Sequence, residues 1–303
     1  MYLEGKNIKL STDSRENLIE IDDKFFQISF LREDNKYVQG GNGIVFSLSD
    51  EQEGIEYVIK FLKYSDEEAT TDWKAKKRYR RFCREIEALY TAKSNDLMGV
   101  IQIEAHGCHM IDGKTFSYYV MEKCDFTLKE FLEAEGGNLD IVQKTIICQK
   151  ILKGIQSLHE YKIYHRDIKH DNIYFLDGEP IIGDLGLSDF QESDIFINEK
   201  GELIGPTGWF SPEAINKYLV EKTANLNGFD CTIDKKSEVF QLGKLFWYIY
   251  QGNIPIGHTE PDDFIPNNPK IYGILNSMLQ NSKVRRFNTS QVAINIGDFL
   301  SSN

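Results

Sequence analysis

The chain has 303 residues, of which 41% are hydrophobic and 12% aromatic, and it carries a net charge of −12. This composition supplies ample apolar material for a core and excludes a globally disordered chain. The acidic balance argues against broad binding to nucleic acid or to an anionic membrane. No apolar run approaches the roughly 18 residues of a membrane span. Because the five cysteines form no C-x-x-C pair, we expect reduced thiols in a cytoplasmic protein.

The first 34 residues are polar apart from one apolar stretch, FFQISFL, and they carry no motif. We treat them as an N-terminal extension that could be an added strand, a regulatory arm or a partner site. Short runs of β-type residues follow at 44–49 and 55–61, and they predict two strands joined by an acidic turn. In the second run, Lys60 lies on the face opposite Tyr57 and Ile59.

A helix is predicted next, because Phe82, Ile86 and Leu89 fall at positions i, i+4 and i+7. Two further strands are predicted at 100–107 and 115–122. The strands and their one helix therefore make up the first part of the chain after the extension, and we expect an N-terminal lobe over residues 35–124.

From about Leu128 the chain becomes mostly helical. Two buried helix stripes are predicted, one at Ile147, Ile151, Ile155 and Leu158, the other at Val239, Leu242, Phe246 and Ile249. Between them, Asp177-Gly178 predicts a hairpin turn that joins two short strands at 172–176 and 180–184. Residues 125–303 are therefore expected to form a second, mostly helical lobe.

The segment VQGGNGIV (38–45) has three glycines in four residues between two strands. Glycine allows a backbone to approach a ligand closely, so such a loop can cover phosphates. A tight hairpin rich in Gly and Asn is the alternative interpretation. Lys60, in the following strand, could offer a compact positive charge to phosphate, although an exposed strand lysine is common.

The segment YHRDIKHDN (164–172) gathers a cluster of His, Arg, Asp, Lys and Asn between a helix and a strand. Asp167 could orient or deprotonate a hydroxyl, and Lys169 could offset charge on a transferred group. Asn172 offers an oxygen ligand of the kind that Mg²⁺ accepts, and Asp184, at the end of the next hairpin, offers a second. Charged or glycine-containing turns without function are the alternative for each segment alone.

In this order the motifs resemble the eukaryotic-type protein kinase family, whose signatures they share. The glycine-rich loop is matched at Gly40, Gly43 and Val45, with Val38 in place of the first glycine. The resemblance also covers the strand lysine, Lys60; the helix glutamate expected to pair with it, Glu85; the catalytic loop, His165 to Asn172; the metal-binding Asp184-Leu185-Gly186; Ser211-Pro212-Glu213; the helix residues Glu238, Phe240 and Gly243; and Arg286, which is expected to pair with Glu213.

The resemblance implies an α+β, bilobal protein kinase fold, with an antiparallel sheet and one helix in the N-terminal lobe. It implies a protein kinase that uses ATP and Mg²⁺. It also implies specificity for Ser and Thr, because Lys169 resembles the Ser/Thr-specific branch. Catalytic roles fall on Asp167, Lys169, Lys60 and Glu85, and metal binding falls on Asn172 and Asp184. The expected nucleotide contacts are Val38, Gly40, Gly41, Gly43, Val45, Val58, Lys60, Met121, Glu122 and Cys124.

Two alternatives to an active protein kinase stay open. A pseudokinase would bind nucleotide or a partner without catalysis, although the set from Lys60 to Asp184 is complete. A small-molecule phosphotransferase of related fold would share the two aspartates but usually lacks the features at Arg166, Lys169 and Ser211-Pro212-Glu213.

Control of activity is a second open question. Arg166 precedes the catalytic aspartate, and in the family this often implies control by phosphorylation. Ser188 and Ser193 are the only hydroxyl residues in the stretch from Leu187 to Gly205, which also holds several acidic residues. A carboxylate could therefore pair with Arg166 in place of phosphate, and a simply solvated loop is the third possibility.

The run KAKKRYRRFCR (74–84) places seven basic residues within an otherwise acidic chain. It could dock an acidic or phosphate-bearing partner, or it could be the solvated start of the helix that carries Glu85. Nucleic acid is not expected as a partner, and neither is a membrane.

Overall fold

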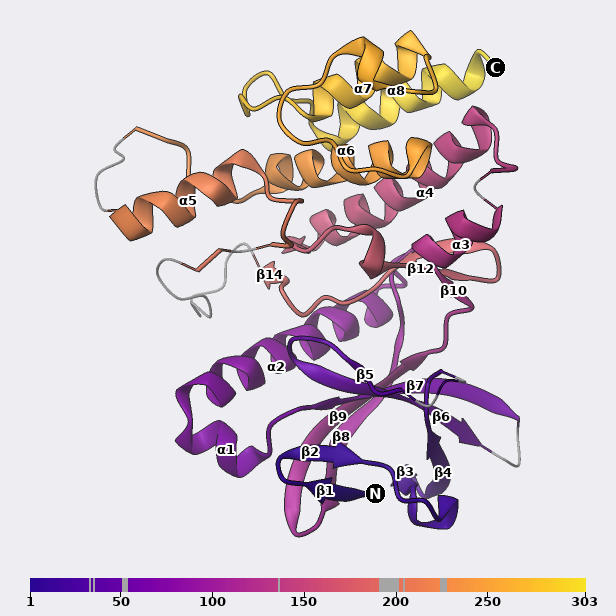
Figure 1. Cartoon of the computed structure of the whole chain (residues 1–303), viewed down its shortest axis with the longest axis vertical. Coiled ribbons are helices and arrows are strands. Elements are labelled where there is room, and N and C mark those ends of the chain that lie inside the picture. Colours follow the sequence, from indigo (N-terminus) through magenta and orange to yellow (C-terminus); the bar gives the residue numbers. More distant parts are fainter. Residues whose placement is uncertain are drawn as a thin grey trace. The chain divides into compact units, whose positions relative to one another are not determined.

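The computed structural model describes residues 1–32, 34, 36–50, 54–135, 137–190, 202–203, 205–223 and 228–303, with the backbone alone at position 39. The chain forms two compact units (Figure 1). The first contains Met1–Asp96 and Ile101–Lys123, and the second contains Leu97–Val100 and Cys124–Asn303. Within the described residues, no helix has the length and apolar character needed to cross a membrane.

The first unit is built on a seven-stranded antiparallel sheet with the order β3-β4-β6-β7-β9-β8, in which β5 also pairs with β6. A separate hairpin, β1 with β2, and a short 3₁₀ helix, Ser14–Glu16, lie at the N-terminus. The strands are β1 (Tyr2–Glu4), β2 (Asn7–Lys9), β3 (Leu18–Ile21), β4 (Lys24–Ser29), β5 (Val38–Gln39), β6 (Gly43–Asp50), β7 (Ile55–Leu62), β8 (Ile103–Ile111) and β9 (Lys114–Glu122).

One face of this sheet carries the core of the unit. Phe46 and Leu48 from β6 and Ile59 and Phe61 from β7 are fully buried in one cluster. Ile8, from the N-terminal hairpin, belongs to the same cluster. Burying a side chain of this size contributes about 1.5–3 kcal/mol. The first 29 residues therefore extend the sheet and cover its core.

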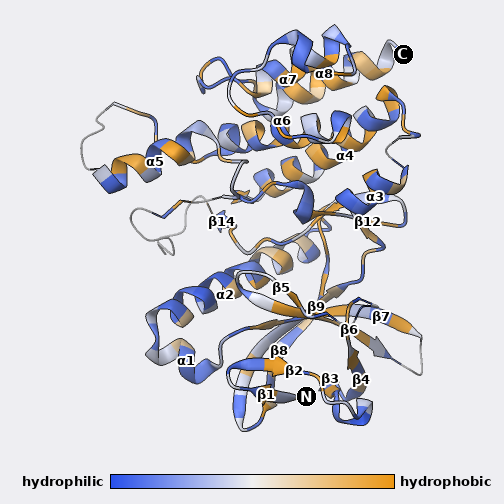
Figure 2. Cartoon of the chain, in the orientation of Figure 1, coloured by the Kyte–Doolittle hydropathy of each residue, from blue (hydrophilic) through white to orange (hydrophobic). Residues whose placement is uncertain are grey.

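The other face of the sheet meets two helices, α1 (Asp66–Thr71) and α2 (Trp73–Ser94). Ser65 begins α1 through a capping box with Glu68. Asp72 ends α1 and caps α2, because its carboxylate accepts hydrogen bonds from the backbone N–H groups of Lys74 and Ala75. The negative charge of Asp72 also offsets the basic run at a helix end that otherwise disfavours cations. The sequence predicted only the longer helix, which Figure 2 shows as mostly hydrophilic.

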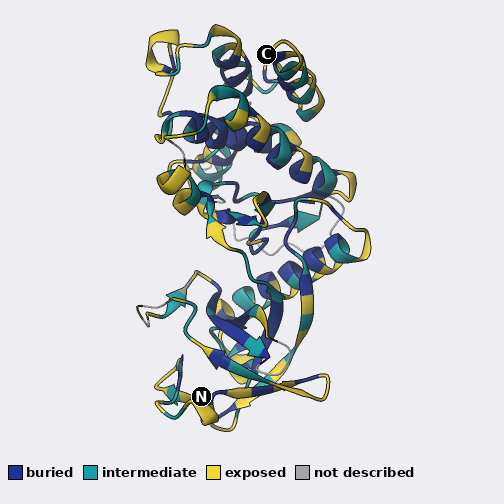
Figure 3. Cartoon of the chain, turned by 90° about the vertical axis from the view of Figure 1, so that its right-hand side faces the viewer, coloured by how far each residue is buried: buried dark blue, intermediate teal, exposed yellow. Residues whose placement is uncertain are grey.

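The second unit is mostly helical, as the sequence predicted, and the α+β fold class is confirmed. Its helices are α3 (Leu128–Glu135), α4 (Ile141–Glu160), α5 (Pro212–Thr223), α6 (Lys235–Gln251), α7 (Pro269–Met278) and α8 (Thr289–Ser301). Both predicted stripes, on α4 and on α6, are buried. Figure 3 shows that buried residues gather along the helices of this unit and along the strands of the first.

Two small sheets position the loops of the second unit. One has the order β10-β12-β13 and the other pairs β11 with β14. The predicted hairpin is present, because β12 and β13 are joined at Asp177 and Gly178, which both have positive φ. The strands are β10 (Phe126–Thr127), β11 (Ile163–Tyr164), β12 (Ile173–Leu176), β13 (Glu179–Ile182) and β14 (Asp189–Phe190), and the 3₁₀ turns are His170–Asn172 and Pro261–Asp263.

Candidate active site

Lys60 and Glu85 form a buried ion pair in the first unit. Lys60 lies in β7 on the face opposite Ile59, and Glu85 lies on α2. The Lys60 Nζ atom is 2.7 Å from Glu85 Oε1, and neither residue is exposed. Burial removes water that would otherwise screen the two charges, so the pair ties the helix to the sheet. The contact that the sequence analysis expected between these two residues is present.

The glycine-rich segment folds as a tight hairpin between β5 and β6, above Lys60. The hairpin is closed by a hydrogen bond from Gly40 N to Gly43 O, 3.0 Å long, and Val38 pairs with Val45. A Cβ atom at Gly43 would lie 2.7 Å from the carbonyl oxygen of Phe61 and 3.0 Å from Lys60 Cγ. Only glycine fits at that position. Gly40, by contrast, has open space around it.

Arg78 connects this hairpin to α2. Its guanidinium donates a hydrogen bond of 2.6 Å to the Oδ1 atom of Asn42, at the tip of the hairpin. Asn42 is itself buried, and its backbone carbonyl accepts from the N–H of Lys63. The sequence analysis offered a docking surface or a solvated helix start for the run that contains Arg78, and it missed this contact. The available signal was its spacing, because Arg78 lies seven residues, two helical turns, before Glu85.

The basic run as a whole is not one uniform surface. Arg81 and Arg84 are buried, and only Lys74, Lys76 and Arg80 are exposed among its basic residues. The run therefore includes two buried cations as well as exposed ones. Among the basic residues of the run, Lys74, Lys76 and Arg80 are the ones exposed to a partner.

The other residues expected to contact nucleotide lie on neighbouring strands or follow them. Val58 in β7 is buried and pairs directly with Met121 in β9. Glu122 ends β9, and its Oε2 atom accepts a hydrogen bond from the N–H of Gln102. Cys124 is the first residue of the second unit's longer segment and is half-buried.

Asp167 lies in the second unit, within the loop between β11 and the 3₁₀ turn, and is buried. Its Oδ2 atom accepts a hydrogen bond of 2.8 Å from Asn172 Nδ2 and lies 3.3 Å from Lys169 Nζ. Burial raises the pKa of the Asp167 carboxyl, and the nearby Lys169 charge opposes that rise. Lys169 and Asn172, which the sequence placed in one motif with Asp167, therefore both contact the Asp167 carboxylate.

The backbone of this loop is fixed by His165. Its Nε2 atom lies 3.1 Å from the carbonyl oxygen of Gly183, and its Nδ1 atom accepts from the N–H of Asp167. The two contacts together require the neutral ring with the proton on Nε2. His165 thus links the loop at 165–172 to the residue just before Asp184.

Asp184 follows β13 and is exposed, with a φ of +52°. The N–H of Gly183, next to it, donates to the carbonyl oxygen of Asn172. The side-chain nitrogen of Asn172 donates to Asp167, so the side-chain oxygen, Oδ1, is the atom that could bind a cation. One carboxylate and one amide oxygen fit Mg²⁺, which binds through few protein ligands together with phosphate oxygens.

Glu238, on α6, supports the loop at 165–172. Its Oε1 atom accepts a hydrogen bond of 2.7 Å from the N–H of Arg166, and its Oε2 atom is 2.5 Å from His159 Nε2. Burial would raise the pKa of Glu238, but the bonds from His159 and Arg166 hold it below its ordinary value. The carboxylate is therefore ionised and fixes the backbone of Arg166, whose φ is +63°.

The side chain of Arg166 pairs with an acid of its own unit. Its Nη2 atom is 2.5 Å from Asp189 Oδ2, and Asp189 lies in β14, which pairs with β11. A carboxylate therefore contacts Arg166, as one of the sequence interpretations allowed. Ser188 is buried next to Asp189, while Ser193 lies outside the described residues.

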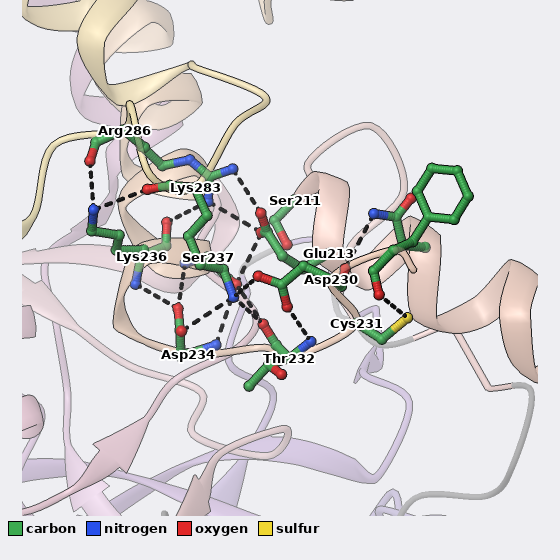
Figure 4. Close-up of polar contacts among 12 residues, drawn as sticks. Ser211, Glu213, Asp230, Cys231, Thr232, Asp234, Lys236, Ser237, Lys283 and Arg286 are labelled. Carbon is green, nitrogen blue, oxygen red and sulfur yellow. Dashed lines mark hydrogen bonds and ion pairs between the residues drawn. The ribbon is translucent and has the colours of Figure 1, made fainter. Parts of the chain in front are cut away.

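Glu213 and Arg286 form the expected pair and the centre of a polar cluster (Figure 4). Both residues are buried, and the Arg286 Nη2 atom is 2.8 Å from Glu213 Oε1. Ser237 donates a hydrogen bond to the second oxygen of Glu213. Lys283, beside them, bonds to Asp230 and Asp234. The cluster joins the start of α5 to the start of α6 and to the segment before α8.

The comparisons with known proteins agree with this geometry. A family model described as protein kinase domain matches residues 32–302, nearly the whole chain. Serine/threonine-protein kinase dst4 of Dictyostelium discoideum is 27% identical over 227 residues, 74% of this chain and 41% of that protein. Serine/threonine-protein kinase TAO1-B of Xenopus laevis is 27% identical over 238 residues, 75% of this chain and 22% of that protein.

A third relative covers a shorter stretch. Serine/threonine-protein kinase mig-15 of Caenorhabditis elegans is 30% identical over 139 residues, 45% of this chain and 12% of that protein. The chain thus spans less than half the length of each of these three relatives. The similarity to each relative is therefore confined to the aligned part of that relative.

Proposed function

The chain belongs to the protein kinase domain family, and on this premise we propose that it is an active protein kinase that transfers the γ-phosphate of ATP to Ser and Thr of other proteins, with Mg²⁺ as cofactor. The observation that carries the proposal is that two sets of side chains, one around Lys60 and one around Asp167, are already in contact. Lys60 is already paired with Glu85, and Asp167 is already held by Lys169 and Asn172. A pseudokinase has no need for both sets to be intact.

The proposed roles follow from the contacts. Lys60, fixed by Glu85, would bind the α- and β-phosphates of ATP beneath the glycine-rich hairpin. Asn172 and Asp184 would hold Mg²⁺, which offsets the negative charge on the transferred group. Asp167 would accept the hydroxyl proton of the substrate, and Lys169 would stabilise the same carboxylate and the transferred phosphoryl group. Phosphoryl transfer depends mainly on such positioning and charge stabilisation.

Ser/Thr specificity and protein substrates are supported less directly. Lys169, two residues after Asp167, resembles the Ser/Thr branch, and the relatives carry that specificity in their names. An acidic or phosphate-bearing partner at Lys74, Lys76 and Arg80 is also part of the proposal, because these cations are exposed.

Transfer from labelled ATP with Mg²⁺, with and without a generic basic protein, tests the proposal. We expect label on Ser and Thr with the wild type, and none with Asp184→Ala. Modified residues are identified by mass spectrometry. Nucleotide that raises the melting temperature without any transfer would identify a pseudokinase. Label on a small alcohol but on no protein would identify a small-molecule phosphotransferase.

Asp189→Ala tests whether the carboxylate beside Arg166 replaces a regulatory phosphate. We expect wild-type protein treated with phosphatase to keep its rate, and Ser193→Ala to match it. Asp189→Ala should lose about tenfold in rate, because a hydrogen bond between charged groups contributes about 1.5–3 kcal/mol and Arg166 would lose one.

Asp189→Glu serves as the conservative control and should restore most of the rate. A wild-type rate that collapses after phosphatase treatment would contradict this interpretation. Loop phosphorylation would then be required.

A further inference from the structure

Tyr119 lies directly beside the Lys60–Glu85 pair. It is in β9, where it is the cross-strand partner of Lys60 in β7, so both side chains leave the same face of the sheet. Its hydroxyl donates a hydrogen bond of 2.9 Å to Glu85 Oε1. That oxygen is the one that Lys60 Nζ contacts at 2.7 Å. A single carboxylate oxygen on α2 therefore receives donors from two adjacent strands.

The ring of Tyr119 is fixed by packing as well. Its centroid is 5.3 Å from that of Phe82, which lies one turn before Glu85 on α2. Lys60 Nζ lies 5.6 Å from the centroid of the Tyr119 ring. Tyr119 is only 1% exposed. The hydroxyl therefore reaches Glu85 from a ring that can adopt few other positions.

Packing alone does not account for a tyrosine at this position, because phenylalanine would fill the same space. The neighbouring residue gives the comparison. Tyr118 is also buried and packs on Phe61, but it lies on the opposite face of β9, towards the core. Of these two tyrosines, Tyr119 is the one whose hydroxyl bonds a carboxylate.

We propose that Tyr119 is a positioning residue, which holds the Glu85 carboxylate, and with it α2, where Glu85 pairs with Lys60. The physical reason is that a buried carboxylate needs donors to offset its lost hydration, and a charge-assisted bond is stronger than a neutral one. The Lys60 bond connects Glu85 on α2 to β7. The Tyr119 bond adds β9 and limits the positions that Glu85 can adopt. This inference rests on the proposed function, in which the Lys60–Glu85 pair orients ATP.

Tyr119→Phe tests the inference, since it removes one oxygen atom and keeps the ring. We expect kcat/KM for ATP to fall about tenfold, the effect of losing a hydrogen bond to a charged group. Hydrogen exchange of the backbone amides around Glu85 on α2 should become faster. Tyr118→Phe, which removes the same atom on the other face, should change neither quantity. Tyr119→Met, another variant without the hydroxyl, should reproduce the loss.

The same change in a Glu85→Gln background separates positioning from a general structural role. If Tyr119 acts through the Glu85 carboxylate, Tyr119→Phe should change the residual rate less than about twofold there, because the coupled partner is already altered. An equal fold-loss in both backgrounds would overturn the proposal, and so would unchanged rate and exchange in the single variant.

Failure of the proposed function gives a different result. A wild-type protein without phosphoryl transfer would contradict the activity, while exchange on α2 would still report on Tyr119. If Tyr119→Phe makes exchange on α2 faster in the wild-type background but not in the Glu85→Gln background, the inference is supported even for a protein that shows no phosphoryl transfer. Unchanged exchange would overturn it.

Discussion

Asp167→Asn is expected to lower the rate of phosphoryl transfer by about 10²–10⁴-fold, the usual contribution of general acid–base catalysis. The amide keeps the size of the carboxylate but cannot accept the substrate proton. Lys169 and Asn172, which now contact the carboxylate, would lose a negative partner at the same time. Initial rates with labelled ATP and a protein substrate give the measurement, and nucleotide binding should persist.

The same substitution should leave stability unchanged or increase it. Burial raises the pKa of Asp167, so its ionised form costs free energy in the folded protein at neutral pH. For an acid with a raised pKa, that cost is fully present above the raised value, shrinks as the pH falls below it and is gone below the ordinary value. A neutral amide removes the cost at every pH. We therefore expect an equal or higher melting temperature together with lost activity, a trade that catalytic residues commonly show.

Asp171→Asn is the matched control, because Asp171 lies in the same loop but is exposed and contacts His170 instead. It should keep most of the rate. An Asp167→Asn variant that retained a rate near that of the wild type would contradict the proposed role. A clear fall in its melting temperature would show that Asp167 serves structure rather than proton transfer.

The order of motifs along the chain predicted which residues within each motif lie close together, because each motif is local. Asp167, Lys169 and Asn172 lie within six residues, and a short loop keeps them close whatever surrounds it. The pair of Arg286 with Glu213 is distant in sequence, and it was predicted only through the family resemblance. Composition and periodicity say nothing about such a contact.

The residues that sequence reasoning missed are those whose role depends on tertiary placement. Tyr119 reads as an ordinary strand residue, and its hydroxyl acquires a partner only because β9 pairs with β7 in one register. Arg78 sits in a basic run that suggests a surface, yet α2 turns it towards Asn42. A one-residue shift in strand register would place a different side chain beside Lys60.

The N-terminal segment shows the same limit at the level of the fold. Short polar strands such as β1 and β2 have little pattern of their own, and they form because Ile8 finds a place in a core made by other strands. Helix α1 begins at the capping box of Ser65 with Glu68, a local signal that the sequence itself carries. Strands such as β7 were easier to predict, because alternation of apolar and polar residues alone identifies the buried face.

Arg286→Ala is expected to lower the free energy of unfolding by about 3–5 kcal/mol, since breaking a buried ion pair leaves an uncompensated charge inside the protein. Glu213 would remain buried, and among the described residues it would keep one bonded side chain, the Ser237 hydroxyl. The guanidinium also donates to the backbone carbonyls of Gln280 and Lys236, so these contacts would be lost together. Chemical denaturation followed by circular dichroism measures the change.

The neighbouring Arg285 provides the control for this loss, because it is exposed and has the same charge. Arg285→Ala should change the free energy of unfolding by less than about 0.5 kcal/mol, as surface substitutions usually do. Arg286→Lys should recover only part of the loss, because an ammonium cannot form two parallel bonds to one carboxylate. Equal effects of the two alanine variants would show that overall charge, rather than the buried pair, decides stability here.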